Sequence, residues 1–107
     1  LIEKAKKEAE EDKIVLFIYP ATSISFTREL SNELSYLYPN KTIIVARNKE
    51  KEYTMSLRNQ KQNIARLLKK SLIGLEGYGG GHEHACGCAV NKKDFNEFIE
   101  RIREGTR

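Results

Sequence analysis

The chain has 107 residues and carries 19 Lys and Arg against 15 Asp and Glu, which gives a formal net charge of +4. This length fits one domain, and no apolar run approaches the roughly 18 residues that a membrane-spanning helix needs. The two cysteines, Cys86 and Cys88, are two positions apart, so a bond between them would join no distant segments and a disulfide-stapled scaffold is excluded. The mildly basic charge is compatible with a polyanionic partner but does not require one.

The first segment, Leu1 to Asp12, consists mainly of Glu, Lys and Ala and predicts a linker helix. Because the chain begins with Leu within a helical pattern, we expect this linker to follow an upstream domain that the chain lacks. The folded domain would then span residues 13–107. The segment has no apolar stretch typical of a secretory leader, so the expected location is cytoplasmic.

The first half of the domain predicts a βαβ unit. Lys13 to Tyr19 and Thr42 to Ala46 are apolar runs rich in β-branched residues, as in strands buried on both faces. Pro20 to Ser23 predicts a turn and helix cap, and Pro39 with Asn40 ends the helix between the strands. The apolar residues of that helix are Phe26, Leu30, Leu34, Leu37 and Tyr38. A short helical connection of this kind predicts parallel strands with a right-handed crossover.

The segment from Tyr53 to Arg58 alternates between apolar and polar residues and predicts a strand with one face in the core. Tyr53, Met55 and Leu57 would point to the core, and Thr54, Ser56 and Arg58 to the other face. The short charged link before Tyr53 favours antiparallel pairing with the preceding strand.

The remaining chain predicts two more helices and one short strand. A helix around Ile64 to Lys70 is followed by a glycine-rich loop, Ile73 to Gly81, and by a strand at Cys88 to Val90. A last helix is capped by Asn91 and Asp94, presents Phe95, Phe98, Ile99 and Ile102 to the core, and ends near Gly105. The predicted fold class is therefore α/β, with a mixed sheet of four to five strands, flanking helices and the N-terminal βαβ unit.

The run Gly79-Gly80-Gly81-His82 is the most unusual chemical feature. Three glycines without Cβ atoms would let backbone N–H groups approach an anion, and a histidine can donate a hydrogen bond to phosphate. A short helical turn starting near His82 would direct further N–H groups to the same place. A flexible turn with an exposed histidine is the alternative that spacing alone leaves open.

The string from Gly79 to Gly87 resembles the G-G-G-H-x-x-A-A-G signature of the C-terminal, DHH-associated domain of DHH phosphoesterases. That superfamily includes RecJ-type exonucleases, oligoribonucleases and cyclic-dinucleotide phosphodiesterases. Met55 to Asn59 is similar to the family's V-S-L-R-S strand, and the resemblance covers nearly the whole chain. Two positions depart from the family pattern, because Cys86 replaces an alanine and Asn59 replaces a serine.

The resemblance implies a substrate-binding domain for single-stranded DNA or RNA, or for the phosphate of a short oligonucleotide. The implied phosphate-binding residues are Arg58, Gly79, Gly80, Gly81 and His82, and further candidates are Ser56, Asn59 and His84. It also implies that Mn²⁺ or Mg²⁺ and the hydrolytic chemistry reside in an upstream catalytic domain. That domain would be a partner of this one, and a homodimer would form through the missing part.

No catalytic residue is expected in this chain itself. Its only aspartates are Asp12 and Asp94, and neither adjoins a histidine, so a two-metal hydrolytic site cannot be assembled from them. By the resemblance, the full-length protein would be a manganese-dependent phosphodiesterase or exonuclease.

Three alternative functions remain open at this stage. The first is a protein-interaction module of a replication or repair complex. The second is a small zinc-binding domain with the alternating ligands His82, His84, Cys86 and Cys88, although four ligands in one extended segment lie along a line. The third is a nucleophilic Cys86 with His84 as its base, for which no third group is indicated.

Overall fold

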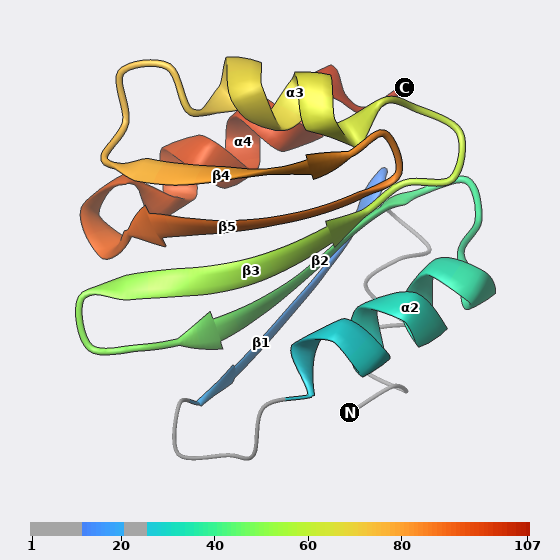
Figure 1. Cartoon of the computed structure of the whole chain (residues 1–107), viewed down its shortest axis with the longest axis horizontal. Coiled ribbons are helices and arrows are strands. Elements are labelled where there is room, and N and C mark those ends of the chain that lie inside the picture. The colour runs from blue at the N-terminus through green and yellow to red at the C-terminus, as the bar shows by residue number, and fades with distance from the viewer. Residues whose placement is uncertain (1–11, 21–25) are drawn as a thin grey trace.

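The computed structural model describes residues 12–20 and 26–107 (Figure 1). A five-stranded mixed sheet with the strand order β1-β2-β3-β5-β4 organises this part of the chain. The strands are β1 (Ile14–Pro20), β2 (Thr42–Asn48), β3 (Glu52–Arg58), β4 (Gly77–His82) and β5 (Ala85–Asn91). The helices are α2 (Thr27–Leu37), α3 (Ile64–Ser71) and α4 (Phe95–Gly105), with a 3₁₀ turn, η1 (Lys92–Asp94), before α4. The predicted α/β class with a mixed sheet is confirmed.

The N-terminal β1-α2-β2 unit has the predicted parallel strands, with Ile14 opposite Thr42. β2 then pairs antiparallel with β3, β3 with β5, and β5 with β4. Of the predicted turn at Pro20–Ser23, Pro20 ends β1 and the other residues lie outside the described residues. The predicted linker helix, 1–12, also lies outside them except for Asp12. No helix in the described ranges is long and apolar enough to cross a membrane.

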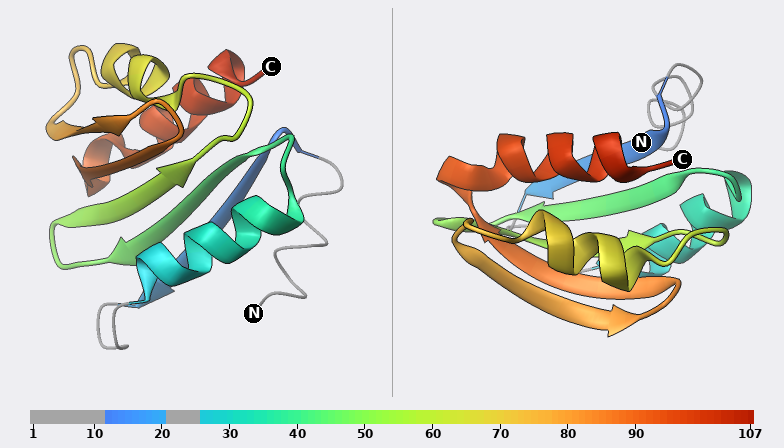
Figure 2. Two further views of the ribbon diagram at one scale, coloured as in Figure 1. Left: turned by 45° about the vertical axis from the view of Figure 1, so that its right-hand side comes forward. Right: turned by 90° about the horizontal axis from the view of Figure 1, so that it is seen from above.

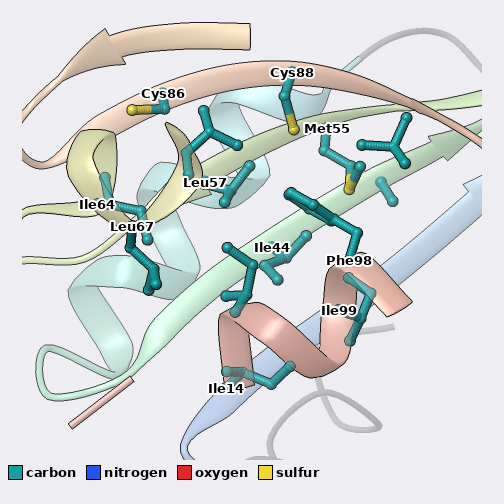
Figure 3. Close-up of a cluster of buried hydrophobic side chains, with 14 of the residues drawn as sticks. Ile14, Ile44, Met55, Leu57, Ile64, Leu67, Cys86, Cys88, Phe98 and Ile99 are labelled. Atoms are coloured by element: carbon teal, nitrogen blue, oxygen red, sulfur yellow. The ribbon is translucent and has the colours of Figure 1, made fainter. Parts of the chain in front are cut away.

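Side chains alternate between the two faces of the sheet, and each face has its own core. On one face, Leu30 and Leu34 of α2 pack against buried residues of β1 and β2 such as Val15 and Val45. The other face carries the larger core, in which Phe98 of α4 and Ile64 of α3 meet the sheet (Figure 3). Figure 2 shows α3 and α4 lying together and α2 lying apart from them.

Helix α2 covers only one half of its face of the sheet. It packs on β1 and β2 and reaches as far as β3, where the Ser31 hydroxyl lies 2.9 Å from the Ser56 hydroxyl. Beyond β3, the residues Gly80 and Gly87 of the β4–β5 pair are exposed on this face. The fold therefore leaves an open surface beside the N-terminal end of α2.

The glycine-rich segment differs from its prediction as a loop. Gly77 to His82 forms strand β4, which pairs along its whole length with β5. Glycine has a low strand propensity, which is why the sequence predicts a loop. The absence of a side chain nevertheless permits close backbone approach: a Cβ on Gly79 would lie 2.4 Å from the Cβ of Cys88. The helical turn expected near His82 is also absent, because the two turn residues after β4 lead directly into β5.

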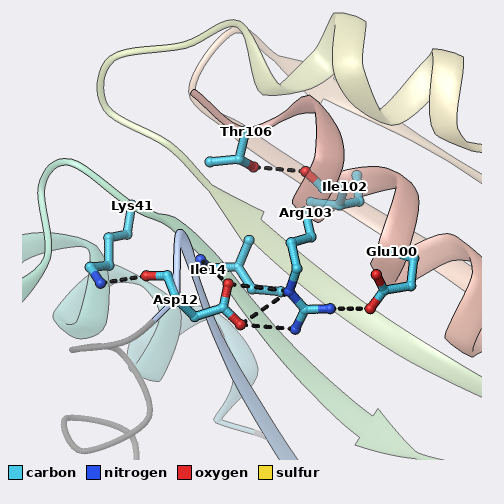
Figure 4. A network of polar contacts seen from close by, with 7 residues as sticks. All are labelled: Asp12, Ile14, Lys41, Glu100, Ile102, Arg103 and Thr106. Atoms are coloured by element: carbon cyan, nitrogen blue, oxygen red, sulfur yellow. Dashed lines mark hydrogen bonds and ion pairs between the residues drawn. The ribbon is translucent and has the colours of Figure 1, made fainter.

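A polar network ties the start of the described chain to α4 (Figure 4). The Arg103 guanidinium donates to the Asp12 carboxylate, with Nη2 2.9 Å from Oδ2, and it also contacts Glu100. The backbone carbonyl of Asp12 accepts a hydrogen bond from Lys41. This network joins the segment before β1 to the helix on the larger core.

Replacing Asp12 by asparagine should lower the free energy of unfolding by about 1 kcal/mol at pH 7. Burial raises the pKa of Asp12, but the hydrogen bond and charge of Arg103 and the N–H groups of Ile14 and Lys13 outweigh it and leave the pKa lowered. The carboxylate's contribution is therefore present above its unfolded pKa of about 4 and is lost as the pH falls through the lower folded pKa. Urea unfolding should show the difference between wild type and variant shrinking toward zero in acid. The exposed Glu33→Gln variant is the control, and a constant difference at every pH would contradict this account.

Candidate functional site

A cavity of about 570 Å³ opens on the exposed half of the sheet. It lies between the first turn of α2 and the strands β3, β5 and β4, and we call it the groove. Its lining includes Thr27, Arg28 and Glu29 of α2, Thr54, Ser56 and Arg58 of β3, and Gly80, Ala85 and Gly87 of β4 and β5. Its volume is in the range of sites that hold small ligands.

The strand register arranges this surface in three rows that run from β3 across β5 to β4. The rows are Thr54 with Ala89 and Tyr78, Ser56 with Gly87 and Gly80, and Arg58 with Ala85 and His82. Polar side chains of β3 thus form one side of the groove, and Tyr78 and His82 stand at the opposite edge of the sheet. The surface between them carries only glycine and alanine.

Arg58 is the half-buried cation of the groove. Its Nε donates to the Asn32 Oδ1 at 2.9 Å, and its Nη1 donates to the Leu57 carbonyl at 2.8 Å. In the part of the chain that the structure describes, no carboxylate lies within ion-pair distance of Arg58. Burial, followed by the nearby charge of Arg28, lowers the pKa of Arg58, although a guanidinium stays protonated at neutral pH. Two guanidinium groups against the single carboxylate of Glu29 make the groove favourable for an anion.

The glycines beside the groove fall into two kinds. At Gly79 and Gly81 an added Cβ would lie 2.4 Å from atoms of β5, and Gly81 also has a positive φ of 156°. At Gly80 a Cβ would meet no described atom within 4 Å, and at Gly87 only the Met55 carbonyl oxygen at 3.7 Å. Packing therefore requires glycine at 79 and 81, and it does not require glycine at 80 and 87.

The glycine run does not form the predicted anion-binding nest of N–H groups. The N–H of Asn91 donates to the Glu76 carbonyl at 2.8 Å, and hydrogen-bonded pairs alternate along an antiparallel ladder. Gly80 and Gly87 are therefore a hydrogen-bonded pair whose polar backbone groups face each other. Gly79 and Gly81 direct theirs to the free edge of β4. Donors for an anion in the groove must come from side chains at its sides.

The three further candidates lie in different surroundings. Ser56 lines the groove and shares its hydroxyl hydrogen bond with Ser31. Asn59 is only 3% exposed, and its carboxamide is hydrogen-bonded to the backbone and to Thr42. His84 occupies the turn after β4, where its Nδ1 lies 2.8 Å from the Asn59 carbonyl oxygen. Ser56 is the one of the three that lines the groove.

Residues 12–106 match the family described as the DHHA1 domain. The chain belongs to the DHHA1 domain family. The resemblance to the DHH-associated domain found in its motifs is thereby confirmed. No curated protein matches the chain.

Several solved structures share the fold of this DHHA1 domain. The C-Ala domain of alanyl-tRNA synthetase from Aquifex aeolicus has a TM-score of 0.70 at 18% identity, covering 85% of this chain and 87% of that one. RecJ in complex with Mn²⁺ from Thermus thermophilus has a TM-score of 0.71 at 14% identity, and the match covers 96% of this chain but 16% of RecJ. The pGpG-specific phosphodiesterase PggH from Vibrio cholerae has a TM-score of 0.58 at 16% identity, covering 95% and 37%. At these identities the likeness establishes the fold alone.

The zinc alternative for the DHHA1 domain is wrong. Cys86 and Cys88 belong to the core on the α3 and α4 side of the sheet, whereas His82 shares the opposite face with Arg58 and His84 lies in the turn. Within ranges 12–20 and 26–107, no three His, Cys, Asp or Glu side chains are grouped as metal ligands. The four residues therefore do not form a tetrahedral site for one metal ion.

The two thiols also lack the surroundings of a nucleophile. Burial raises the pKa of Cys86, and burial together with the neighbouring Cys86 raises the pKa of Cys88 to about 12. The His84 Nδ1 is hydrogen-bonded to a backbone carbonyl, and the Cys86 thiol donates to the His82 carbonyl at 3.4 Å. Cys86 with His84 as a catalytic pair is therefore not supported by this arrangement.

Arg28 and Gly87 are among the groove residues that the sequence reasoning missed. Arg28 comes from α2, and only the packing of that helix beside β3 brings its charge near Arg58. Gly87 ends the glycine-histidine motif, and the sequence alone assigns it no role. Gly87 shares one face of β5 with Ala85 and Ala89, and this spacing of small residues at every second position was the sequence signal that could have identified it.

Proposed function

We propose that this DHHA1 domain binds single-stranded nucleic acid or a short oligonucleotide through the groove and presents it to an upstream catalytic domain of a DHH phosphoesterase. The supporting observation is Arg58, a half-buried guanidinium with no carboxylate partner among the described residues, beside the part of β5 and β4 whose exposed face carries glycine and alanine. The full-length protein would be a metal-dependent phosphodiesterase or exonuclease whose catalytic residues lie outside this chain.

The geometry of Arg58 suits a backbone phosphate. Its Nε and Nη1 are held by protein oxygens, which fixes the plane of the guanidinium and leaves Nη2 as the donor for a ligand. Arginine donates to phosphate oxygens in a fork and retains its charge. Arg28, exposed at the start of α2, adds a second positive charge at the same end of the groove.

His82 would contact the nucleic acid at the other side of the groove. It is in the same row as Arg58, separated from it by Ala85 of β5, and two strand spacings amount to roughly 10 Å. An extended oligonucleotide can cross this distance and reach both side chains. Gly80 lies beside His82 and leaves the path across β4 open.

Titrating the domain with a single-stranded octanucleotide tests this proposal. We expect amide chemical-shift changes around Arg58, Gly80 and Gly87, with an affinity that falls between 50 and 200 mM salt because each phosphate contact releases counterions. EDTA should have no effect. Arg58→Gln should weaken binding by about tenfold, the equivalent of about 1.4 kcal/mol for one charged hydrogen-bonded contact.

Arg66→Gln is the matched control for this titration, because it removes the same charge from the exposed side of α3. It should change the affinity less than twofold. Equal losses from the two variants would show binding driven by net charge alone, and shifts spread over the surface would oppose the groove. The interaction-module alternative would be favoured if no shift occurred at any concentration.

A further inference from the structure

Strand β1 is an edge strand, and no described strand pairs with its outer side (Figure 1). On its inner side, the Lys13 carbonyl accepts a hydrogen bond from the Thr42 N–H at 3.2 Å. In a parallel ladder every second residue directs its N–H and C=O to the partner strand, so the odd-numbered residues of β1 face β2. The even-numbered residues Ile14, Leu16 and Ile18 therefore direct their backbone groups to the free edge.

The two ends of this edge offer no free donor. The N–H of Ile14 donates to the Asp12 carboxylate at 3.3 Å, and Pro20 has no N–H. Within the described ranges, no residue forms a hydrogen bond with the outward groups of Leu16 and Ile18. These two residues carry the N–H donors that remain free along the edge of β1.

The side chains of β1 also lack the usual protection of an edge strand. Natural edges are commonly blocked by charged residues, but the sequence of β1 is IVLFIYP. Leu16 packs against the larger core, and alternation places Ile18 on the same face, where it is 44% exposed. An exposed isoleucine next to unpaired backbone groups is a surface that an added strand would bury.

A second copy of β1 fits this edge when the two strands run antiparallel. With Leu16 opposite Ile18 of the second copy, the two residues exchange both backbone hydrogen bonds, and the two-fold axis repeats the exchange. Every free N–H of the two edges then has an acceptor. Pairing Leu16 with its own equivalent would instead require the Ile14 N–H, which Asp12 already accepts. Opposite residues share a face, so the exposed Ile18 would pack on Leu16 of the second copy.

We propose that two copies of this chain associate through antiparallel β1 edges and join their five-stranded sheets into one continuous sheet. The contact is isologous, so it closes at two copies. The groove lies at the other end of the sheet, on β3, β5 and β4, and stays open in the pair. The inference goes beyond the proposed function and does not depend on it.

Sedimentation equilibrium of the chain over a range of concentrations tests this interface. One added strand pair is smaller than the interfaces of about 1,000 Å² that hold stable dimers, so we expect a dissociation constant of about 100 µM. The mass should rise toward that of two copies at about 1 mM. Amide exchange of Leu16 and Ile18 should be about fourfold slower there than at about 10 µM, because their N–H groups are paired only in the dimer.

Two variants of Ile18 separate the backbone contact from the side chain. Ile18→Pro removes an N–H that β2 does not use, and edge strands tolerate proline, so the dissociation constant should rise about thirtyfold. Ile18→Ala keeps this N–H and shortens the side chain, and the constant should rise about fivefold. Ile73→Ala, at an isoleucine that is 69% exposed after α3, is the matched control and should change the constant less than about twofold.

Amide spectra at low concentration would verify that each variant folds. Ile18→Lys replaces the proline variant if that variant does not fold, and its charge should weaken association about tenfold. A single copy at about 1 mM, growth beyond two copies, or equal weakening by Ile73→Ala would overturn the interface. Slower exchange at Gly79 and Gly81, on the free edge of β4, in place of Leu16 and Ile18 would overturn it as well. The measurement contains no oligonucleotide, so its failure leaves the proposed function intact.

Discussion

Gly79→Ala should lower the free energy of unfolding by about 3 kcal/mol, as expected for overpacking between backbones. The new Cβ would lie 2.4 Å from the Cys88 Cβ and 2.6 Å from the Gly87 carbonyl oxygen. Neither of these atoms is the end of a flexible side chain, so β4 would have to move away from β5. Urea unfolding followed by circular dichroism would measure the loss.

The neighbouring Gly80→Ala variant is the matched control. It makes the same chemical change one position along the same strand, but its Cβ meets no described atom within 4 Å. Its stability should equal that of the wild type or exceed it slightly, because alanine restricts the unfolded chain more than glycine does. Equal destabilisation by both variants would contradict the division of the glycines into packing and groove positions.

Gly81 is the second glycine that packing against β5 requires. A Cβ on Gly81 would lie 2.4 Å from the Ala85 carbonyl oxygen and 2.8 Å from the Cys86 Cα. Loss of binding in Gly81→Val would therefore follow from damage to the β4–β5 pair. The contact of Gly79 and Gly81 with phosphate, implied by the family motif, stays a prediction, and Gly80 is the glycine of the run that best suits a direct test.

The elements that the sequence predicts correctly are those with a strong apolar pattern. The run Ile14 to Tyr19, the alternation from Tyr53 to Arg58 and the helical stripe of Phe98 and Ile102 each correspond to an observed element. Strand β4 has no apolar pattern, since four of its six residues are glycine. Its strand geometry comes from pairing with β5, which is a tertiary interaction that local propensity does not include.

The candidate site also depends in part on tertiary contacts that local sequence patterns do not predict. Alternation along β3 correctly places Ser56 and Arg58 on the face away from the larger core. The proximity of Arg28, by contrast, depends on where α2 crosses the sheet, and that of Gly87 depends on β5 pairing between β3 and β4. Neither feature has a local signature, because both follow from contacts between distant segments.

Asn59→Ala should also lower the free energy of unfolding by about 3 kcal/mol, because it removes three side-chain hydrogen bonds worth about 1 kcal/mol each. The Asn59 Oδ1 accepts hydrogen bonds from the N–H groups of Lys61 at 2.8 Å and Gln62 at 2.7 Å. Its Nδ2 donates to the Thr42 hydroxyl at 2.8 Å, and that hydroxyl lies 2.9 Å from the Thr106 hydroxyl. The side chain thus connects the end of β3 to β2 and to the residue that follows α4.

Asn40→Ala, at an exposed turn position, provides the control for Asn59 and should cost less than about 0.5 kcal/mol. Oligonucleotide titration under conditions where both variants remain folded then separates stability from binding. A structural Asn59 predicts unchanged affinity in the folded variant, whereas a ligand-binding Asn59 predicts weaker binding with little loss of stability. Because the carboxamide is already hydrogen-bonded to three protein groups beneath the surface, we expect unchanged affinity in the folded variant. The asparagine that replaces the family's serine at this position would then stabilise the turn after β3.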